Sequence, residues 1–89
     1  MATPQSVAEW MVEEVKRRRE VYQEEIVWQI KSTFGEQFTY YNNNGNLAIG
    51  KDVLKHFNKL SKDIIVWQRS ERMWRLRRPG DEPGRLQNY

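Results

Sequence analysis

Basic side chains gather in one part of this 89-residue chain, between Lys51 and Arg78. That stretch holds nine of the fifteen lysines and arginines with three acidic residues, a local charge of +6, whereas the remainder has six basic and nine acidic residues, or −3. Ammonium and guanidinium groups bind phosphate oxygens, and arginine also presents a planar fork that matches guanine edges. Charge separated in this way favours a polyanionic partner. We therefore predict a nucleic-acid-binding surface made of Lys51, Lys55, Asn58, Lys59, Lys62, Arg69, Arg72, Arg75 and Arg77.

The residues that catalysis or metal binding would need are scarce. His56 is the only histidine and cysteine is absent, so a zinc or copper site would need carboxylates around one imidazole. A serine nucleophile would need the same His56 as its base. Residues 45–51 lack the Gly-Lys-Ser/Thr ending of a phosphate loop. We expect a protein that is not an enzyme and that uses no cofactor or metal ion.

Length and composition are typical of one small domain. The absence of cysteine excludes disulfides, and no run of about 18 apolar residues exists. The first residues lack the basic-then-apolar order of a signal peptide. We expect a soluble, cytoplasmic protein with no membrane partner, in which residues 1–78 form the domain and the Pro- and Gly-containing residues 79–89 form a tail.

Two helices are predicted before Gly35. The pair Thr3-Pro4 is typical of a helix start, with Ser6 and Glu9 as a competing capping box, and the first helix covers residues 4–18. A second apolar pattern ends at Gly35, a residue suited to a helix end with positive φ. The apolar spacing runs through residues 19–21, so one continuous helix is an alternative; we favour a break. The second helix has its stripe at Tyr22, Ile26, Ile30 and Phe34.

Trp28 lies off this stripe, about 240° round from Tyr22 at 100° per residue. The second helix should therefore contact the rest of the protein on two sides, with the first helix as the second contact. If Trp28 is exposed instead, it is a candidate interface for a homodimer or for a protein partner.

A third helix is predicted from Gly50, after an extended loop or small hairpin that contains Asn44-Gly45. Its core stripe is Val53, Leu54, Phe57 and Leu60, and the lysines project from the other side. Two terminal strands should pair around a turn at Ser70-Glu71, which places Trp67 opposite Trp74 and Ile65 opposite Leu76. The fold class is therefore α+β, with three helices and a C-terminal β-hairpin.

Residues 50–78 resemble the recognition helix and wing of a winged helix-turn-helix, which implies a DNA-binding module whose third helix and hairpin contact double-stranded DNA. The resemblance rests on Val53-Leu54, Phe57 and Leu60 followed by Ile64-Ile65-Val66-Trp67 and Trp74-Arg75-Leu76-Arg77. The link over residues 36–49 departs from the motif, whose turn has about 3–4 residues.

The whole chain also resembles a family of small uncharacterised bacterial and phage proteins. This resemblance implies a bacterial or phage origin and no established activity. The segments that support it are Tyr22-Gln23-Glu24, Phe34-Gly35-Glu36, Asn44-Gly45-Asn46-Leu47-Ala48-Ile49, Val53-Leu54-Lys55, Val66-Trp67, Arg69, Arg72, Trp74-Arg75 and Pro83-Gly84-Arg85.

Three other interpretations stay open. A charged helix face is often only solvated surface. The domain can have a winged shape yet bind a protein or a second copy of itself near Trp28. The arginine hairpin can also bind a single strand, although it has few aromatic side chains to spare for stacking.

Overall fold

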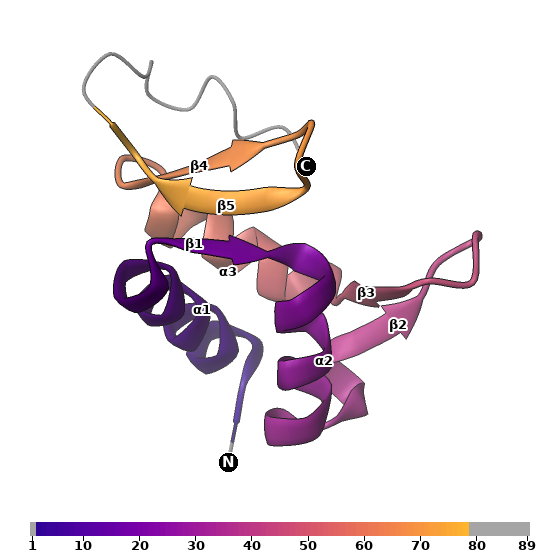
Figure 1. Cartoon of the computed structure of the whole chain (residues 1–89). Coiled ribbons are helices and arrows are strands. Elements are labelled where there is room, and N and C mark those ends of the chain that lie inside the picture. The colour runs from indigo at the N-terminus through magenta and orange to yellow at the C-terminus, as the bar shows by residue number, and fades with distance from the viewer. Residues whose placement is uncertain (1, 79–89) are drawn as a thin grey trace.

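The computed structural model describes residues 2–78 as an α+β fold of three helices and two antiparallel sheets (Figure 1). The predicted α+β class, the three helices and the C-terminal hairpin are confirmed, and the predicted tail, residues 79–89, lies outside the described residues. In chain order the elements are α1 (Pro4–Arg18), β1 (Glu20–Tyr22), α2 (Gln23–Phe34), the 3-10 turn η1 (Glu36–Phe38), β2 (Thr39–Tyr41), β3 (Leu47–Ile49), α3 (Lys51–Ser61), β4 (Ile65–Gln68) and β5 (Met73–Leu76).

Helix α1 begins where Thr3 and Ser6 cap each other. The Ser6 amide donates to Thr3 Oγ1 at 3.1 Å, and the Thr3 amide donates to Ser6 Oγ at 2.8 Å. These bonds satisfy amides that a helix start leaves without a partner, and Pro4 has no amide to satisfy. The competing box of Ser6 with Glu9 is not used.

The break between α1 and α2 is confirmed, and it contains a strand that the sequence did not predict. Arg19 has φ +77°, which ends the helix, and its amide still donates to the carbonyl of Val15 at 2.8 Å. The next residues form β1, which pairs antiparallel with β5 so that Val21 lies opposite Trp74. The chain thus leaves α1, crosses the sheet edge and enters α2 directly.

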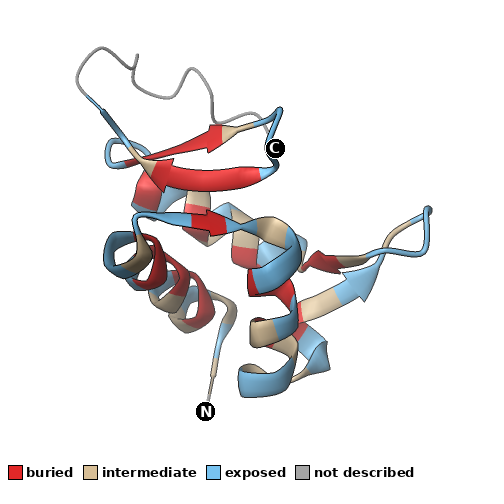
Figure 2. Cartoon of the chain, in the orientation of Figure 1, coloured by how far each residue is buried: buried red, intermediate tan, exposed pale blue. Residues whose placement is uncertain are grey.

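The C-terminal hairpin has the predicted register. Trp67 lies opposite Trp74 and Ile65 opposite Leu76, and β5 is the central strand of the order β1-β5-β4. The Trp67 and Trp74 ring centroids are 4.8 Å apart. Trp74 is fully buried and also contacts Phe57 of α3, with centroids 5.1 Å apart and planes at 70°. The buried positions gather where the three helices meet this sheet (Figure 2).

Helix α3 packs chiefly against α1, whereas α2 packs on β3 and η1. Val53 and Phe57 occupy the core as predicted, but Leu60 is 42% exposed and Ser61 is buried in its place. The buried side of α3 is therefore rotated toward positions 53, 57 and 61, which are spaced by four residues. The prediction for Leu60 was wrong because three- and four-residue spacings fit the same apolar pattern.

The expected contact of α2 with α1 is present, because Phe34 of α2 meets Trp10 of α1 with ring centroids 5.2 Å apart. This contact does not bury Trp28, which is 54% exposed. Its neighbours are Tyr41 and Leu47 of the β2–β3 hairpin, with which it lines a cleft. The 36–49 link, expected to be a loop or small hairpin, forms η1 and this hairpin, and the hairpin projects beside α2 (Figure 1).

Candidate functional site

The lysines of α3 lie on the side of the helix that faces away from the core. Lys51, Lys55 and Lys59 are spaced by four residues and share one helix face, and all three are exposed. Lys62, directly after the helix, is also exposed. Phe57 on the opposite side is fixed by its contact with Trp74, so the orientation of the lysine face follows from core packing.

Few acidic groups neutralise this lysine face. Lys51, Lys55 and Lys59 make no ion pair with any other residue between positions 2 and 78. The exposed Asp52 lies among them, where it lines a shallow cleft of about 320 Å³ with Lys55, His56 and Lys59. The face therefore presents more positive than negative charge to solvent. Its cations follow one another along the helix and do not surround an enclosed pocket.

Asn58 is placed differently from the lysines. Its side chain is half-buried, and its Oδ1 is buried without a hydrogen-bond partner in the described part of the chain. A base-reading side chain would need its carboxamide turned outward, toward the groove. Contact of Asn58 with a base edge thus stays a prediction, and it requires the side chain to turn.

The hairpin arginines fall into two groups. Arg69 and Arg72 are exposed in the turn between β4 and β5, whereas Arg77 follows β5 at the other end, where its amide donates to the carbonyl of Ile64 at 2.8 Å. Since Ile64 comes two residues after Lys62, Arg77 lies close in the fold to the end of the lysine face. The turn instead reaches α2, because the Gln23 amide donates to the Arg72 carbonyl at 3.0 Å.

Arg75 does not have the exposure that was expected of it. Only 8% of the residue is exposed. Its Nε donates to Gln68 Oε1 at 3.0 Å, and its Nη1 donates to the carbonyl of Leu76 at 3.2 Å. On this outer face of the hairpin Val66 and Met73 are buried as well. Arg75 thus bonds within the hairpin and, unlike Arg69 and Arg72, does not extend into solvent.

A second pair of basic residues, Arg17 and Arg18 of α1, forms ion pairs with Glu14. Glu14 receives a hydrogen bond from Arg17 at 2.6 Å and lies 2.9 Å from Arg18. The hydrogen bond from Arg17 is the main reason that the pKa of Glu14 is lowered, and the charges of Arg17 and Arg18 add to it against the opposing effect of burial. These arginines stabilise the end of α1.

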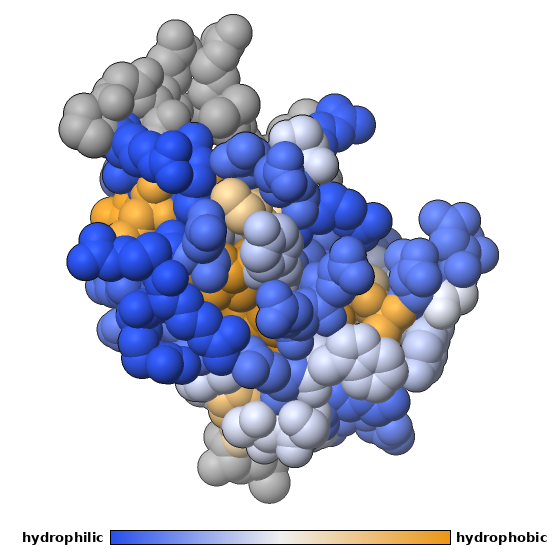
Figure 3. All heavy atoms as spheres, viewed as in Figure 1, coloured by the Kyte–Doolittle hydropathy of each residue, from blue (hydrophilic) through white to orange (hydrophobic). Residues whose placement is uncertain are grey.

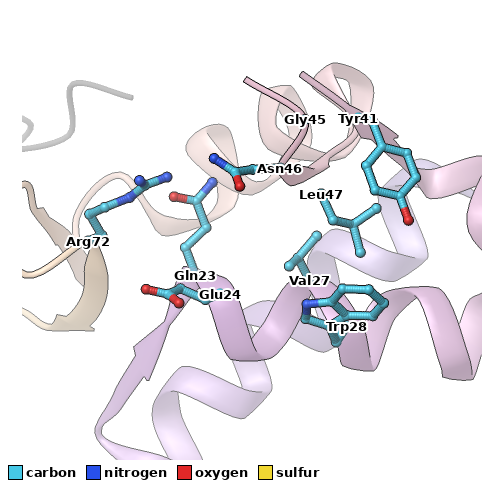
Figure 4. Close-up of a pocket in the computed structure, with 9 residues that line it drawn as sticks. All are labelled: Gln23, Glu24, Val27, Trp28, Tyr41, Gly45, Asn46, Leu47 and Arg72. Atoms are coloured by element: carbon cyan, nitrogen blue, oxygen red, sulfur yellow. The ribbon is translucent and has the colours of Figure 1, made fainter. Parts of the chain in front are cut away.

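A feature that the sequence did not predict is a cleft of about 350 Å³ between α2, the β2–β3 hairpin and the β4–β5 turn. Trp28, Tyr41 and Arg72 contribute to it (Figure 4). Hydrophobic surface is visible where α2 meets this hairpin (Figure 3). The off-stripe position of Trp28 was the available signal, and it was interpreted either as a second contact within the fold or, if exposed, as an interface for a partner.

Comparison with known proteins gives one match. The model of a family of unknown function, DUF6953, matches residues 3–76. No curated protein and no solved structure matches the chain. The expectation of an uncharacterised family is thereby confirmed, and the match carries no information on a bacterial or phage origin. None of the helices between residues 2 and 78 is long and apolar enough to cross a membrane.

Proposed function

We propose a DNA-binding, non-enzymatic role for this chain, which belongs to the family of unknown function DUF6953. The lysines of α3, namely Lys51, Lys55, Lys59 and Lys62, neutralise phosphates of a duplex. Arg69 and Arg72 at the hairpin turn and Arg77 at its base hold the flanking backbone. Most of these contacts position the protein on DNA and do not read its sequence.

The observation that supports this role best is the exposed lysine face of α3. Three lysines at four-residue spacing lack an ion-pair partner among the described residues, and the Phe57–Trp74 contact holds the helix that carries them. A chain selected only for solubility would distribute its charges more evenly. Lysines on one rigid helix face can approach successive phosphates together, with little side-chain reorganisation.

The element order supports a winged helix-turn-helix arrangement for this role. A third helix with a basic outer face is followed by an antiparallel hairpin with arginines in its turn. The β2–β3 hairpin between α2 and α3, and the packing of α3 on α1, depart from the simple helix-turn-helix. We therefore propose that α3 lies along the phosphate backbone or enters the major groove at an angle of its own.

Charge-removing variants test the proposal. Each phosphate contact contributes about 0.9 to the slope of log K against log salt concentration. We expect Lys55→Ala and Arg72→Ala each to reduce the slope for a mixed-sequence duplex by about one. Lys16→Ala is the matched control, because Lys16 is an exposed lysine on α1, outside the proposed surface. Equal slopes for all three variants would contradict the proposal.

A second candidate function rests on Trp28. This side chain is 54% exposed and Tyr41 beside it is 60% exposed, and aromatic residues are frequent hot spots of protein interfaces. A protein-interaction or homodimerisation module would use this region. Sedimentation of the wild type and of Trp28→Glu over a range of concentrations tests the dimer: a monomer in both cases would contradict it.

A further inference from the structure

The cleft beside Trp28 has an apolar half and a polar half (Figure 4). Val27, Trp28, Leu47 and Tyr41 form one side, and Gln23, Glu24, Asn46 and Arg72 form the other. Its volume of about 350 Å³ is near the lower end of the range for small-ligand sites, about 300–1,000 Å³. A matching ligand has a flat apolar part joined to a hydrogen-bonding and anionic part.

The apolar half offers two aromatic rings that are held apart. Tyr41 lies opposite Leu47 in the β2–β3 register, so both side chains are on the same face of the hairpin. The Lys31 ammonium lies 5.3 Å from the ring centroid of Trp28 and 5.6 Å from that of Tyr41. Each ring therefore contacts a flexible cation that a ligand can displace, and each remains more than half exposed.

The polar half is held by backbone hydrogen bonds. The Arg72 carbonyl accepts from the Gln23 amide, which ties the β4–β5 turn to the start of α2. Asn46 is fixed in its loop by two bonds with Asn42, its amide donating to Asn42 Oδ1 at 3.0 Å and its carbonyl accepting from the Asn42 amide at 2.9 Å. Carboxamides such as those of Gln23 and Asn46 both donate and accept, as base edges require, and arginine binds phosphate.

We propose that this cleft binds one unpaired nucleotide of a nucleic-acid strand. The base lies against Trp28 and Tyr41, its edge meets the carboxamides of Gln23 and Asn46, and the phosphate meets Arg72. Glu24 accepts a hydrogen bond from an exocyclic amino group or a sugar hydroxyl. The inference rests on the proposed function, because Arg72 belongs both to the cleft and to the DNA-binding surface.

The charges favour a nucleotide over a peptide or a second copy of the chain. Arg72 lines the polar half, and the Lys31 ammonium lies 5.3 and 5.6 Å from the two ring centroids of the apolar half. Glu24 is the single acidic residue among the described residues that line the cleft. Stacking on exposed aromatic side chains tolerates any base, since every base has a π face. A duplex seated on the lysine face and the hairpin turn would then have an unpaired end, or a gap, at this cleft.

The test compares a blunt duplex with the same duplex carrying a three-nucleotide single-stranded overhang, by fluorescence anisotropy of labelled DNA at low salt. We expect the wild type to bind the overhang duplex about tenfold more tightly, which is the effect of one base stacked on an aromatic ring. Trp28→Leu and Tyr41→Leu should abolish this preference and leave the affinity for blunt duplex unchanged. Tyr40→Leu is the matched control, because Tyr40 is adjacent on β2, is also exposed, at 40%, and is not among the residues that line the cleft.

The outcomes separate the cleft from the proposed function. Equal affinity of the wild type for both duplexes would overturn the nucleotide site and leave duplex binding intact. An overhang preference that survives both Trp28→Leu and Tyr41→Leu would also overturn the site. If neither duplex binds, quenching of tryptophan fluorescence by a free trinucleotide decides between two outcomes. Quenching by the wild type that is lost in Trp28→Leu would support the nucleotide site in the cleft and overturn the duplex-binding surface. No quenching would overturn both the nucleotide site and the duplex-binding surface. A change in oligomeric state in Trp28→Leu, without a change in DNA preference, would assign the cleft to a second copy of the chain.

Discussion

Phe57 of α3 contacts Trp74 of β5 edge to face, with ring centroids 5.1 Å apart, and both side chains are fully buried. This contact joins the helix that carries the lysine face to the central strand of the sheet. Phe57→Ala removes it and leaves a cavity, so we expect the free energy of unfolding to fall by about 3–5 kcal/mol. Urea denaturation measures the change. Phe57→Leu keeps most of the apolar volume and should therefore cost less. An equal loss for both variants would show that the lost ring contact, and not the cavity, accounts for the change.

Arg19 has φ +77° at the end of α1, a conformation that glycine adopts without strain. We expect Arg19→Gly to raise the free energy of unfolding by about 1 kcal/mol, because the penalty for a side chain at positive φ disappears. Lys16, within the helix, supplies the control: Lys16→Gly should have a free energy of unfolding about 1 kcal/mol lower than that of Lys16→Ala. Thermal denaturation distinguishes the two, and a loss of stability in Arg19→Gly would show that the arginine side chain makes a stabilising contact.

Glu14 makes the stability depend on pH. Its pKa is lowered from the ordinary value, first by the hydrogen bond from Arg17 and then by the charges of Arg17 and Arg18. A carboxyl group with a lowered folded-state pKa stabilises the protein above its unfolded-state pKa, and this stabilisation is lost as the pH falls through the folded-state pKa. Glu14→Gln should therefore be less stable than the wild type at pH 7. The difference should shrink below about pH 4, the region of the unfolded glutamate pKa. A difference that is the same at pH 7 and pH 2 would contradict this origin.

Asn58 has a buried Oδ1 with no hydrogen-bond partner among residues 2–78. An unsatisfied buried acceptor costs about 1–3 kcal/mol. Asn58→Leu removes the acceptor at similar size, so we expect unfolding to become less favourable by about 1 kcal/mol, with duplex affinity unchanged. Urea denaturation and a duplex titration check the two effects. Weaker binding to some sequences only would instead show that Asn58 turns outward and reads a base, as the sequence predicts.

The terminal hairpin was predictable because its information is local. The β-branched and aromatic run from Ile65 to Trp67 and the alternation from Trp74 to Leu76, around a short turn, favour the one register that places both tryptophans on one face. Strand β1 was not predictable from the sequence. Its three residues continue the apolar spacing of the helices, and its partner, β5, lies about fifty positions further along the chain. Its formation depends on tertiary pairing that no local pattern shows.

The candidate site was predictable in part for the same reason. The exposure of Lys51, Lys55 and Lys59 follows from helical spacing opposite Phe57. The burial of Arg75 does not follow from alternation, because in a strand the outer face can also be covered. The cleft at Trp28 depends on where the β2–β3 hairpin docks on α2, which is a property of the whole fold.

The salt dependence of duplex binding by the wild type tests the central claim most directly. If the four lysines of the α3 face, Lys51, Lys55, Lys59 and Lys62, each neutralise one phosphate, log K should fall with log salt concentration at a slope of about −3.6, and steeper if the hairpin arginines take part. Mixed-sequence duplex DNA titrated from about 50 to 200 mM salt spans the range in which such a slope is measurable. A slope near zero, or no binding at the lowest salt, would contradict a DNA-binding role for this surface.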